Sequence, residues 1–481
     1  MEIPLNNFQR GILATVGVYL LNACASTWNL VPYLYPYIGS YYHHKDSLIT
    51  VSSTGLLASI FTVSEGLLMS VTIVLYSHWG LKKTYLLILT IQLVGNILAS
   101  WTSNFYVFSV LFSVANAFPS GGFMYVSLYC VWRYFSPKAK GLLSGIVMSS
   151  LALFPVVTSN IAFHIINPDN SSTQGGKNGD IFPPEVASRF PGFIRSLAYF
   201  YFVVGIIGCA LILEPLAKEI ETTENVGHVQ LEVPLVEPNS ERPTFETELE
   251  DEVVDAAETK ITLSDIKDCF KDPLFLKILV IKTATWVGYH FFMLHYKSTG
   301  LKYMPQADKN LNIIGNLSSI SNALSRLGGG LLYKRLKYSH TQLVLLGILG
   351  FSVVAMQPST VSFFLFGSSV CIMYVSYGLF ISSYPLVFDD AFGRQGGLKI
   401  SLAFGLTFSV GSYFNYLISP PLLGLFGEVI TGLIIVIIIF TGWYYIPQVT
   451  VAIHNKLRAK SEKILFDRHK KTEIKELQAV N

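Results

Sequence analysis

Charged residues are scarce in this sequence. Asp, Glu, Lys and Arg make up only 14 % of its 481 residues, whereas 51 % are hydrophobic. A water-soluble protein of this size needs more charge to cover its surface. The apolar residues also come in long blocks, and a block of about 20 residues spans the ~30 Å hydrocarbon core of a bilayer. The sequence therefore excludes an ordinary soluble domain and predicts an all-α polytopic membrane protein.

Motifs for enzymatic chemistry are also absent. The sequence has no GxxxxGK[ST] loop for ATP, no HExxH zinc motif and no GxSxG nucleophile turn. Its five cysteines stand singly, without the CxxC spacing of a metal or redox site. We therefore expect no enzymatic activity, no cofactor, no metal and no nucleic-acid partner.

Hydropathy predicts twelve membrane spans, and each is assigned as a helix because only a helix satisfies every backbone group within one segment in lipid. The spans are 11–38, 52–76, 84–101, 105–131, 141–164, 193–214, 274–297, 311–333, 341–357, 361–388, 399–424 and 428–447. The N-terminal residues lead into span one without a cleavage signal, so we expect span one to stay uncleaved. The predicted organisation is an N-terminus (1–10), a first six-helix half (11–214), an acidic linker (215–273), a second six-helix half (274–447) and a basic tail (448–481).

Basic residues orient the spans. They follow spans two, four and eight and fill the tail, and the loops after spans three and nine have none. The positive-inside rule then predicts that both termini are cytosolic. The acidic segment 217–272 has too little apolar area to fold alone, although Thr262–Asp272 begins like a short helix. Asn170, in the long outside loop, begins an Asn-Ser-Ser triplet and is a candidate for glycosylation.

Two junctions carry a family resemblance. Residues 132–145 read WRYFSPKAKGLLSG and residues 322–334 read NALSRLGGGLLYK. Both resemble motifs of the major facilitator superfamily, closest to the oxalate/formate antiporter and monocarboxylate porter group. The resemblance implies two six-helix halves around a central cavity that rock to alternate access, and it implies a monomer. Lys334 and Ser77 stand where that group has acids, so its acid-based gating latch is not expected here.

The leading substrate-binding candidate is Arg326 in span eight. A charge inside a membrane is costly and tends to face a cavity or a partner. Ser319, Asn322 and Arg326 share one helix face, and a guanidinium fork suits a carboxylate. The alternative is that Arg326 snorkels to the cytosol or pairs structurally. The resemblance supports binding, because matching families use an arginine there for organic anions.

Further polar residues lie within the spans. Asn29 and Tyr33 in span one can line the path or hydrogen-bond between helices. Asn415 and Tyr416 offer polar lining in span eleven, where the lysine of oxalate-type members has no match, and this weakens a dicarboxylate assignment. Glu65 is a candidate proton carrier or ion-pair partner, and His290 a candidate proton carrier or packing residue.

The sequence leaves three functions open. The first is a secondary transporter of a small, monocarboxylate-like organic anion, coupled to protons or working by exchange. The second is a porter for amino acids or another neutral or zwitterionic solute. The third is a non-transporting membrane sensor or scaffold that uses the acidic linker and basic tail for docking. The transport hypotheses predict two partners, a small molecule and the lipid bilayer.

Overall fold

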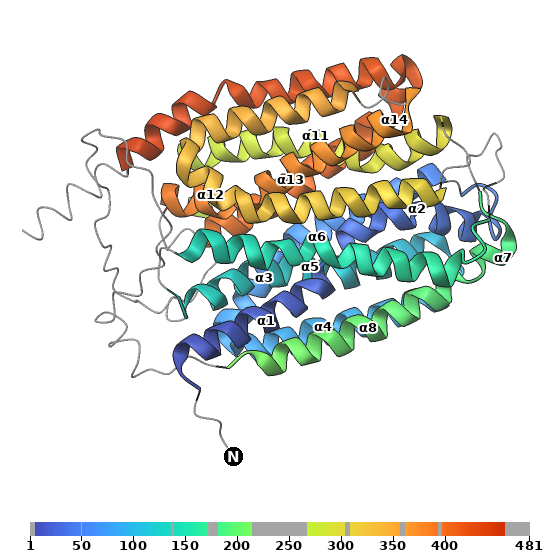
Figure 1. The fold of residues 1–481 in the computed structure, drawn as a ribbon, viewed down its shortest axis with the longest axis horizontal. Coiled ribbons are helices and arrows are strands. Elements are labelled where there is room, and N and C mark those ends of the chain that lie inside the picture. Colours follow the sequence, from blue (N-terminus) through green and yellow to red (C-terminus); the bar gives the residue numbers. More distant parts are fainter. Residues whose placement is uncertain are drawn as a thin grey trace, which may run out of the picture.

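The computed structural model describes residues 5–49, 51–135, 139–171, 173, 181–213, 267–303, 308–355, 361–392 and 397–456. Within these ranges the elements are helices, arranged as a long bundle (Figure 1). The first group is α1 Asn7–Ala25, α2 Thr27–His43, the 3-10 turn η1 Val51–Thr54, α3 Gly55–Trp79, α4 Leu81–Trp101, α5 Phe105–Trp132, α6 Lys140–Ile166, α7 Pro184–Ala187 and α8 Phe190–Leu211. The second group is α11 Pro273–Tyr303, α12 Asp308–Ala355, α13 Phe363–Phe392 and α14 Gly397–Trp443. Most of the linker and the tail predicted from the sequence lie outside the described residues.

Local sequence explains where several helices begin. Asn6 and Gln9 form a capping box, which starts α1 at Asn7, four residues before the predicted span. Asn104 caps α5 by accepting hydrogen bonds from two backbone N–H groups of the first turn. Gly80 adopts a φ of 75°, a conformation that favours glycine, and so joins α3 to α4 without a loop.

The first predicted span is interrupted at Ser26. The chain forms two helices there, α1 and α2, and α2 continues to His43, beyond the predicted end at 38. Two prolines inside α2, Pro32 and Pro36, each remove a backbone donor from the helix. The Ser26 hydroxyl donates to the carbonyl of Ala23 at 2.6 Å, which satisfies one acceptor beside the break.

Helix α12 has 48 residues, and a straight helix of that length would rise about 72 Å, more than twice the thickness of the hydrocarbon core. Its contacts with α11 show that it folds back. In order along α12, these contacts pair Leu311 with Gly300, Gln342 with Lys282 and Leu349 with Gly288. The first arm therefore runs antiparallel to α11 and the second arm runs parallel to it, as the ribbon of α12 does in Figure 1.

Helix α14 also passes α11 twice. Its contacts, in order, pair Gly411 with Trp286, Asn415 with Val287, Ile439 with Gly288 and Gly442 with Ile281. The predicted spans eight and nine thus lie in α12, and spans eleven and twelve lie in α14. Among the described residues, nine helical stretches are long and apolar enough to cross a membrane. The all-α fold is confirmed, and the total of twelve spans stays a prediction.

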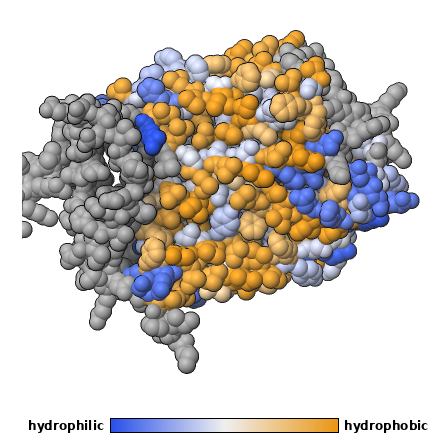
Figure 2. Space-filling view, in the orientation of Figure 1, coloured by the Kyte–Doolittle hydropathy of each residue, from blue (hydrophilic) through white to orange (hydrophobic). Residues whose placement is uncertain are grey.

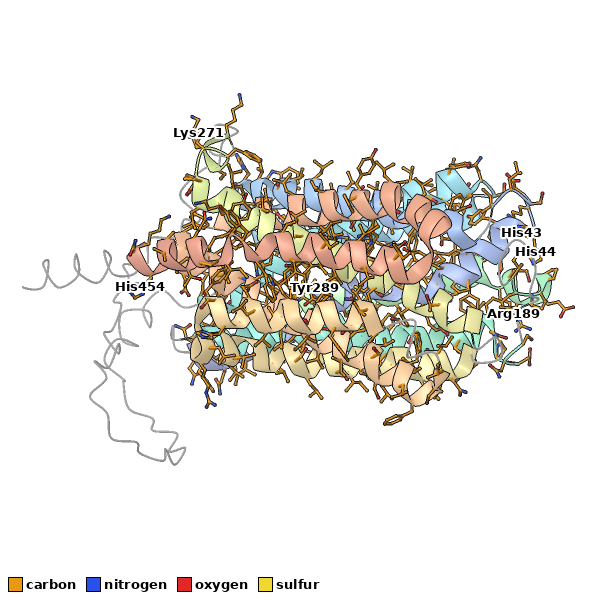
Figure 3. All side chains as sticks on the ribbon, turned by 90° about the horizontal axis from the view of Figure 1, so that it is seen from above. His43, His44, Arg189, Lys271, Tyr289 and His454 are labelled. Carbon is orange, nitrogen blue, oxygen red and sulfur yellow. The ribbon has the colours of Figure 1, made fainter. Side chains whose placement is uncertain are left out.

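The surface supports membrane insertion. Figure 2 shows apolar residues over the middle of the bundle and hydrophilic residues toward its ends. Figure 3 places Lys271 and His454 at one end and His43, His44 and Arg189 at the other. The described beginning of α1 lies at the same end of the bundle as the last helical residues (Figure 1). Which end faces the cytosol stays a prediction.

Glycines let the two halves of the bundle approach closely. A Cβ on Gly66 of α3 would lie 2.5 Å from the carbonyl oxygen of Gly405 in α14. A Cβ on Gly145 of α6 would lie 2.8 Å from the carbonyl oxygen of Arg326 in α12. Small residues at such crossings allow backbone contact between membrane helices. The halves therefore meet along two seams, α3 with α14 and α6 with α12.

Candidate functional site between the two halves

Arg326 lies at the α6–α12 seam. Its side chain is 1 % exposed. Its Nε donates to Asn322 Oδ1 at 2.9 Å on the same helix, and its Nη1 donates to the carbonyl oxygen of Met148 on α6 at 2.7 Å. The ring centre of Tyr377 on α13 is 5.5 Å from Cζ. The guanidinium therefore neither snorkels nor pairs with an acid within the described part of the chain, where both ion pairs lie elsewhere, Arg189–Asp169 and Lys271–Asp268.

One stretch of α6 supplies acceptors to three other helices. Asn22 of α1 donates to Val147 O, Arg326 of α12 to Met148 O, and Asn29 of α2 to Leu151 O. Leu151 O has no intrahelical donor because residue 155 is a proline without an N–H. Asn29 Nδ2, at 2.9 Å, fills this vacancy, and its Oδ1 is buried with no hydrogen bond among the described residues.

An aromatic cluster joins the halves at the centre of the bundle. Trp28 of α2 lies 5.1 Å from Phe61 of α3 and 5.5 Å from His290 of α11, measured between ring centres. The His290 ring is stacked on Trp286 at 5.9 Å with an interplanar angle of 9°, and Phe408 of α14 lies 4.1 Å from Trp286. His290 is therefore held between two tryptophans, one from each half.

Glu65 is the only buried carboxylate among the described residues. Ser120 Oγ donates to its Oε1 at 2.5 Å. Gly121, the next residue of α5, packs against the backbone of Glu65. Tyr377 interacts electrostatically with both Glu65 and Arg326. The carboxylate and the guanidinium thus approach the same tyrosine from opposite halves.

A second cation reaches across the halves nearer the end of α2. Lys297 of α11 is 3 % exposed, and its Nζ lies 4.1 Å from the ring centre of Tyr33 and 3.4 Å from the Tyr33 carbonyl oxygen. The ring of Tyr37, one turn later, is stacked on Phe182 at 4.8 Å. The cation–π contact of Lys297 with Tyr33 joins α11 of the second half to α2 of the first half.

The predicted site residues therefore separate into groups. Arg326 and Asn322 are bonded to each other, and Ser319, on the same helix, is half-buried. Asn415 donates to the carbonyls of Val287 and Gly411 inside the second half, and the side chain of Tyr416 lies outside the described residues. Asn170 is exposed in the turn after α6, with a positive φ of 50°.

Sequence reasoning missed the contributions of Trp28, Tyr377 and Lys297. Lys297 was expected at the end of span seven, but α11 continues to Tyr303. The polar run that begins at Lys297 lowers local hydropathy and made the span appear to end there. Tryptophans and tyrosines score as ordinary membrane residues, so hydropathy gave no signal for the aromatic cluster.

The defining sequence pattern of the Major Facilitator Superfamily matches residues 16–414, which include both seams and every residue of the central cluster. The chain belongs to the Major Facilitator Superfamily. No curated protein matches it. As a member of this superfamily, the protein is a multi-pass membrane transporter with a small-molecule substrate.

Proposed function

We propose that this protein is a secondary active transporter of a small organic anion, monocarboxylate-like, that works by alternating access with proton coupling or exchange. The observation that carries the proposal is the guanidinium of Arg326, buried between the halves with no carboxylate bound to it among the described residues. A buried cation without an anion is unfavourable. A substrate carboxylate supplies the missing charge.

Hydrogen bonding supports a carboxylate in particular. A guanidinium has five N–H donors, and the bonds to Asn322 and Met148 use two of them. The bond to Met148 crosses between the halves, so a bidentate carboxylate can replace this carbonyl when the seam opens. Binding at Arg326 is thereby linked to the separation of α6 from α12.

The surroundings favour a small, partly apolar substrate. Trp28, Trp286 and Phe408 present ring faces and edges at the centre of the bundle. Ligand sites of this kind combine apolar walls with a few polar groups that fix orientation. A short carbon chain can pack on the rings while its carboxylate meets Arg326.

Proton coupling is proposed for Glu65, with His290 as the second candidate. Glu65 lies on the first half and has one hydrogen-bond partner, Ser120. Protonation of a buried carboxylate removes its charge, which eases movement of the halves through an apolar seam. His290, held between Trp28 and Trp286, gains cation–π attraction to both rings when protonated.

A zwitterionic substrate is the second candidate. Glu65 of the first half and Arg326 of the second half both interact electrostatically with Tyr377. One carboxylate and one guanidinium supply the two opposite charges that the ammonium and carboxylate of an amino acid require. Uptake competition between a monocarboxylate and its α-amino counterpart distinguishes the two substrates. We also propose cytosolic termini and a monomer.

The decisive experiment is uptake into proteoliposomes by the Arg326→Gln variant. Losing two charge-assisted hydrogen bonds lowers carboxylate uptake at least about 100-fold. Arg335→Gln is the matched control, because Arg335 lies on the same helix but is exposed, and it retains uptake. Normal uptake by a well-expressed Arg326→Gln protein refutes the proposed substrate site.

A further inference from the structure

A second buried cation lies wholly within the second half. Lys282 of α11 is 0 % exposed. Its Nζ lies 3.4 Å from Gln342 Oε1 on the second arm of α12 and over two rings of α13, at 4.8 Å from Phe380 and 4.7 Å from Tyr384. Ring faces and an amide oxygen stabilise an ammonium ion and offer little to a neutral amine. Burial opposes the charge on this amine, so an anion beside Nζ would favour the ammonium form.

No acid neutralises this charge in the described part of the chain. The two ion pairs found there involve other lysine and arginine residues. Asp390, near the end of α13, accepts a hydrogen bond from Tyr333 Oη at 2.8 Å and forms no ion pair with Lys282. A buried ammonium without a counter-charge is expensive in a membrane, so a bound anion would remove a large penalty.

Two further donors beside Lys282 lack acceptors. Gln342 Nε2 and the hydroxyl of Tyr338 are buried and make no hydrogen bond among the described residues. Gln342 follows Tyr338 by four residues on one helix, so both side chains share a face. The Tyr338 ring also interacts electrostatically with Tyr384, which flanks Lys282. A buried donor left unpaired is unfavourable, and here two accompany a buried amine that has no counter-charge among the described residues.

We propose that Lys282, Gln342 and Tyr338 form a binding site for a small inorganic anion of the size and charge of chloride. One spherical acceptor can take hydrogen bonds from Nζ, Nε2 and the tyrosine hydroxyl together. The two heteroatoms of the Gln342 amide share a carbon, so Nε2 lies one amide width from the oxygen that faces Nζ. The site is distinct from the proposed substrate site, because the contacts of Lys282 with Gln342, Phe380 and Tyr384 lie within the second half and do not involve Arg326.

The location suggests how an anion would enter. Lys282 lies nine residues after the start of α11, about 14 Å along the helix. Tyr338 begins the apolar stretch Tyr338–Ala355 of α12. Figure 3 shows Lys271, which precedes α11, at the end of the bundle that also holds His454. The site therefore lies nearer the end of the bundle at which α11 begins.

The test is thermal unfolding of the purified full-length protein in sodium chloride and in sodium methanesulfonate, which has no carboxylate, at equal ionic strength. Chloride raises the unfolding midpoint in a saturable manner, because a ligand that binds the native state stabilises it. Lys282→Met loses the saturable shift. Lys271→Met, a matched change at an exposed lysine, keeps it.

Three more variants guard against misfolding and against confusion of the two sites. Gln342→Leu and Tyr338→Phe keep the lysine and raise the half-saturating chloride concentration at least tenfold. Arg326→Gln keeps the full chloride shift, even if the proposed substrate site is wrong. Equal midpoints in chloride and methanesulfonate for the unmodified protein overturn the proposal, as does an unchanged shift in Lys282→Met. Loss of the chloride shift in Arg326→Gln assigns the anion to the central site and likewise overturns it.

Discussion

The two halves of the bundle bury polar groups of different kinds. In the first half, the described buried polar side chains are neutral except for Glu65, whereas the second half buries three cations, Lys282, Lys297 and Arg326. Neutral amides can satisfy one another within a single helical half. Cations cannot satisfy one another, because Lys and Arg side chains carry only hydrogen-bond donors. They therefore require acceptors from the other half, from ring faces or from a ligand. The buried polar groups of the first half can therefore bond to one another, whereas the buried cations of the second half depend on other partners.

The first half shows how neutral groups hold helices together. Asn116 Oδ1 of α5 accepts hydrogen bonds from Thr27, Gln92 and Asn96, at 3.1 to 3.2 Å. These donors come from α2 and α4. The network therefore ties three helices at the level of the break at Ser26.

Two of the three buried cations of the second half contact the first half instead. Arg326 and Lys297 both lie against carbonyl oxygens of the first half, at Met148 and Tyr33. Carbonyls are weaker partners for a cation than carboxylates. Contacts of moderate strength between the halves can break and form again during a transport cycle.

The largest expected effect comes from obstructing the seam between the halves. In Gly66→Ala, the new methyl group meets the carbonyl oxygen of Gly405 at 2.5 Å. Overpacking of about 3 kcal/mol disfavours the close-packed state and lowers uptake about 100-fold. Gly347→Ala is the control, since a Cβ there meets nothing within 4 Å. Equal uptake by both variants would show that transport does not need the close packing of α3 against α14 at Gly66.

The neutral network can be tested by stability. Asn116→Ala removes three hydrogen bonds that Asn116 accepts and the two that its Nδ2 donates. It lowers the free energy of unfolding by about 3 kcal/mol, at ~0.6 kcal/mol for each bond in a membrane. In the second half, Asn415→Ala removes donors to two helix carbonyls and has a smaller effect. Thermal unfolding in detergent measures both variants. If Asn415→Ala loses more unfolding free energy than Asn116→Ala, the contrast between the halves is contradicted.

The one carboxylate that is buried in the described part of the first half, Glu65, is tested through its proposed role in proton coupling. Glu65→Gln keeps a side chain that can accept from Ser120 but cannot release a proton. Uptake driven by a pH gradient falls about tenfold, equivalent to about 1.4 kcal/mol, while exchange without a gradient continues. Glu185→Gln, at an exposed glutamate of α7, is the control. A normal response of Glu65→Gln to the gradient assigns coupling elsewhere, with His290 next.

The smallest effect is expected at Lys297. Replacement by Met removes cation–π attraction to Tyr33 of about 1 kcal/mol, which shifts the equilibrium between closed and open states about fivefold. A cysteine introduced at the buried Ser40 reports opening by its rate of thiol modification. The native cysteines give little background, because four of the five are buried.

Lys45→Met is the matched control for this opening. Lys45 lies over Tyr41 at 4.3 Å, within the first half and on the surface. Removal of this contact leaves the thiol modification rate unchanged. A similar increase in both variants shows that Lys297 does not hold the halves together.

Sequence reasoning predicted the all-α fold, most helix positions to within a few residues and the superfamily. It also identified Arg326, Glu65 and His290 as unusual residues within spans. These results follow because the cost of placing charge in lipid depends on depth, and depth can be read from position along one helix. Ser319 and Asn322 were grouped with Arg326 by periodicity, and the structure joins Asn322 to Arg326 directly.

The partners of these residues were decided by tertiary structure. Hydropathy has no term for which helix faces which, so it cannot pair Arg326 with the Met148 carbonyl or Asn29 with the acceptor freed by Pro155. It also cannot place Lys282 among Phe380, Tyr384 and Gln342, because those contacts join segments about 60 to 100 residues apart. The amino-acid order by itself determined that the chain crosses a membrane as helices, since burial of the backbone in lipid permits little else. The packing of those helices alone decided which cations meet a partner, because that depends on rotation and crossing of separate segments.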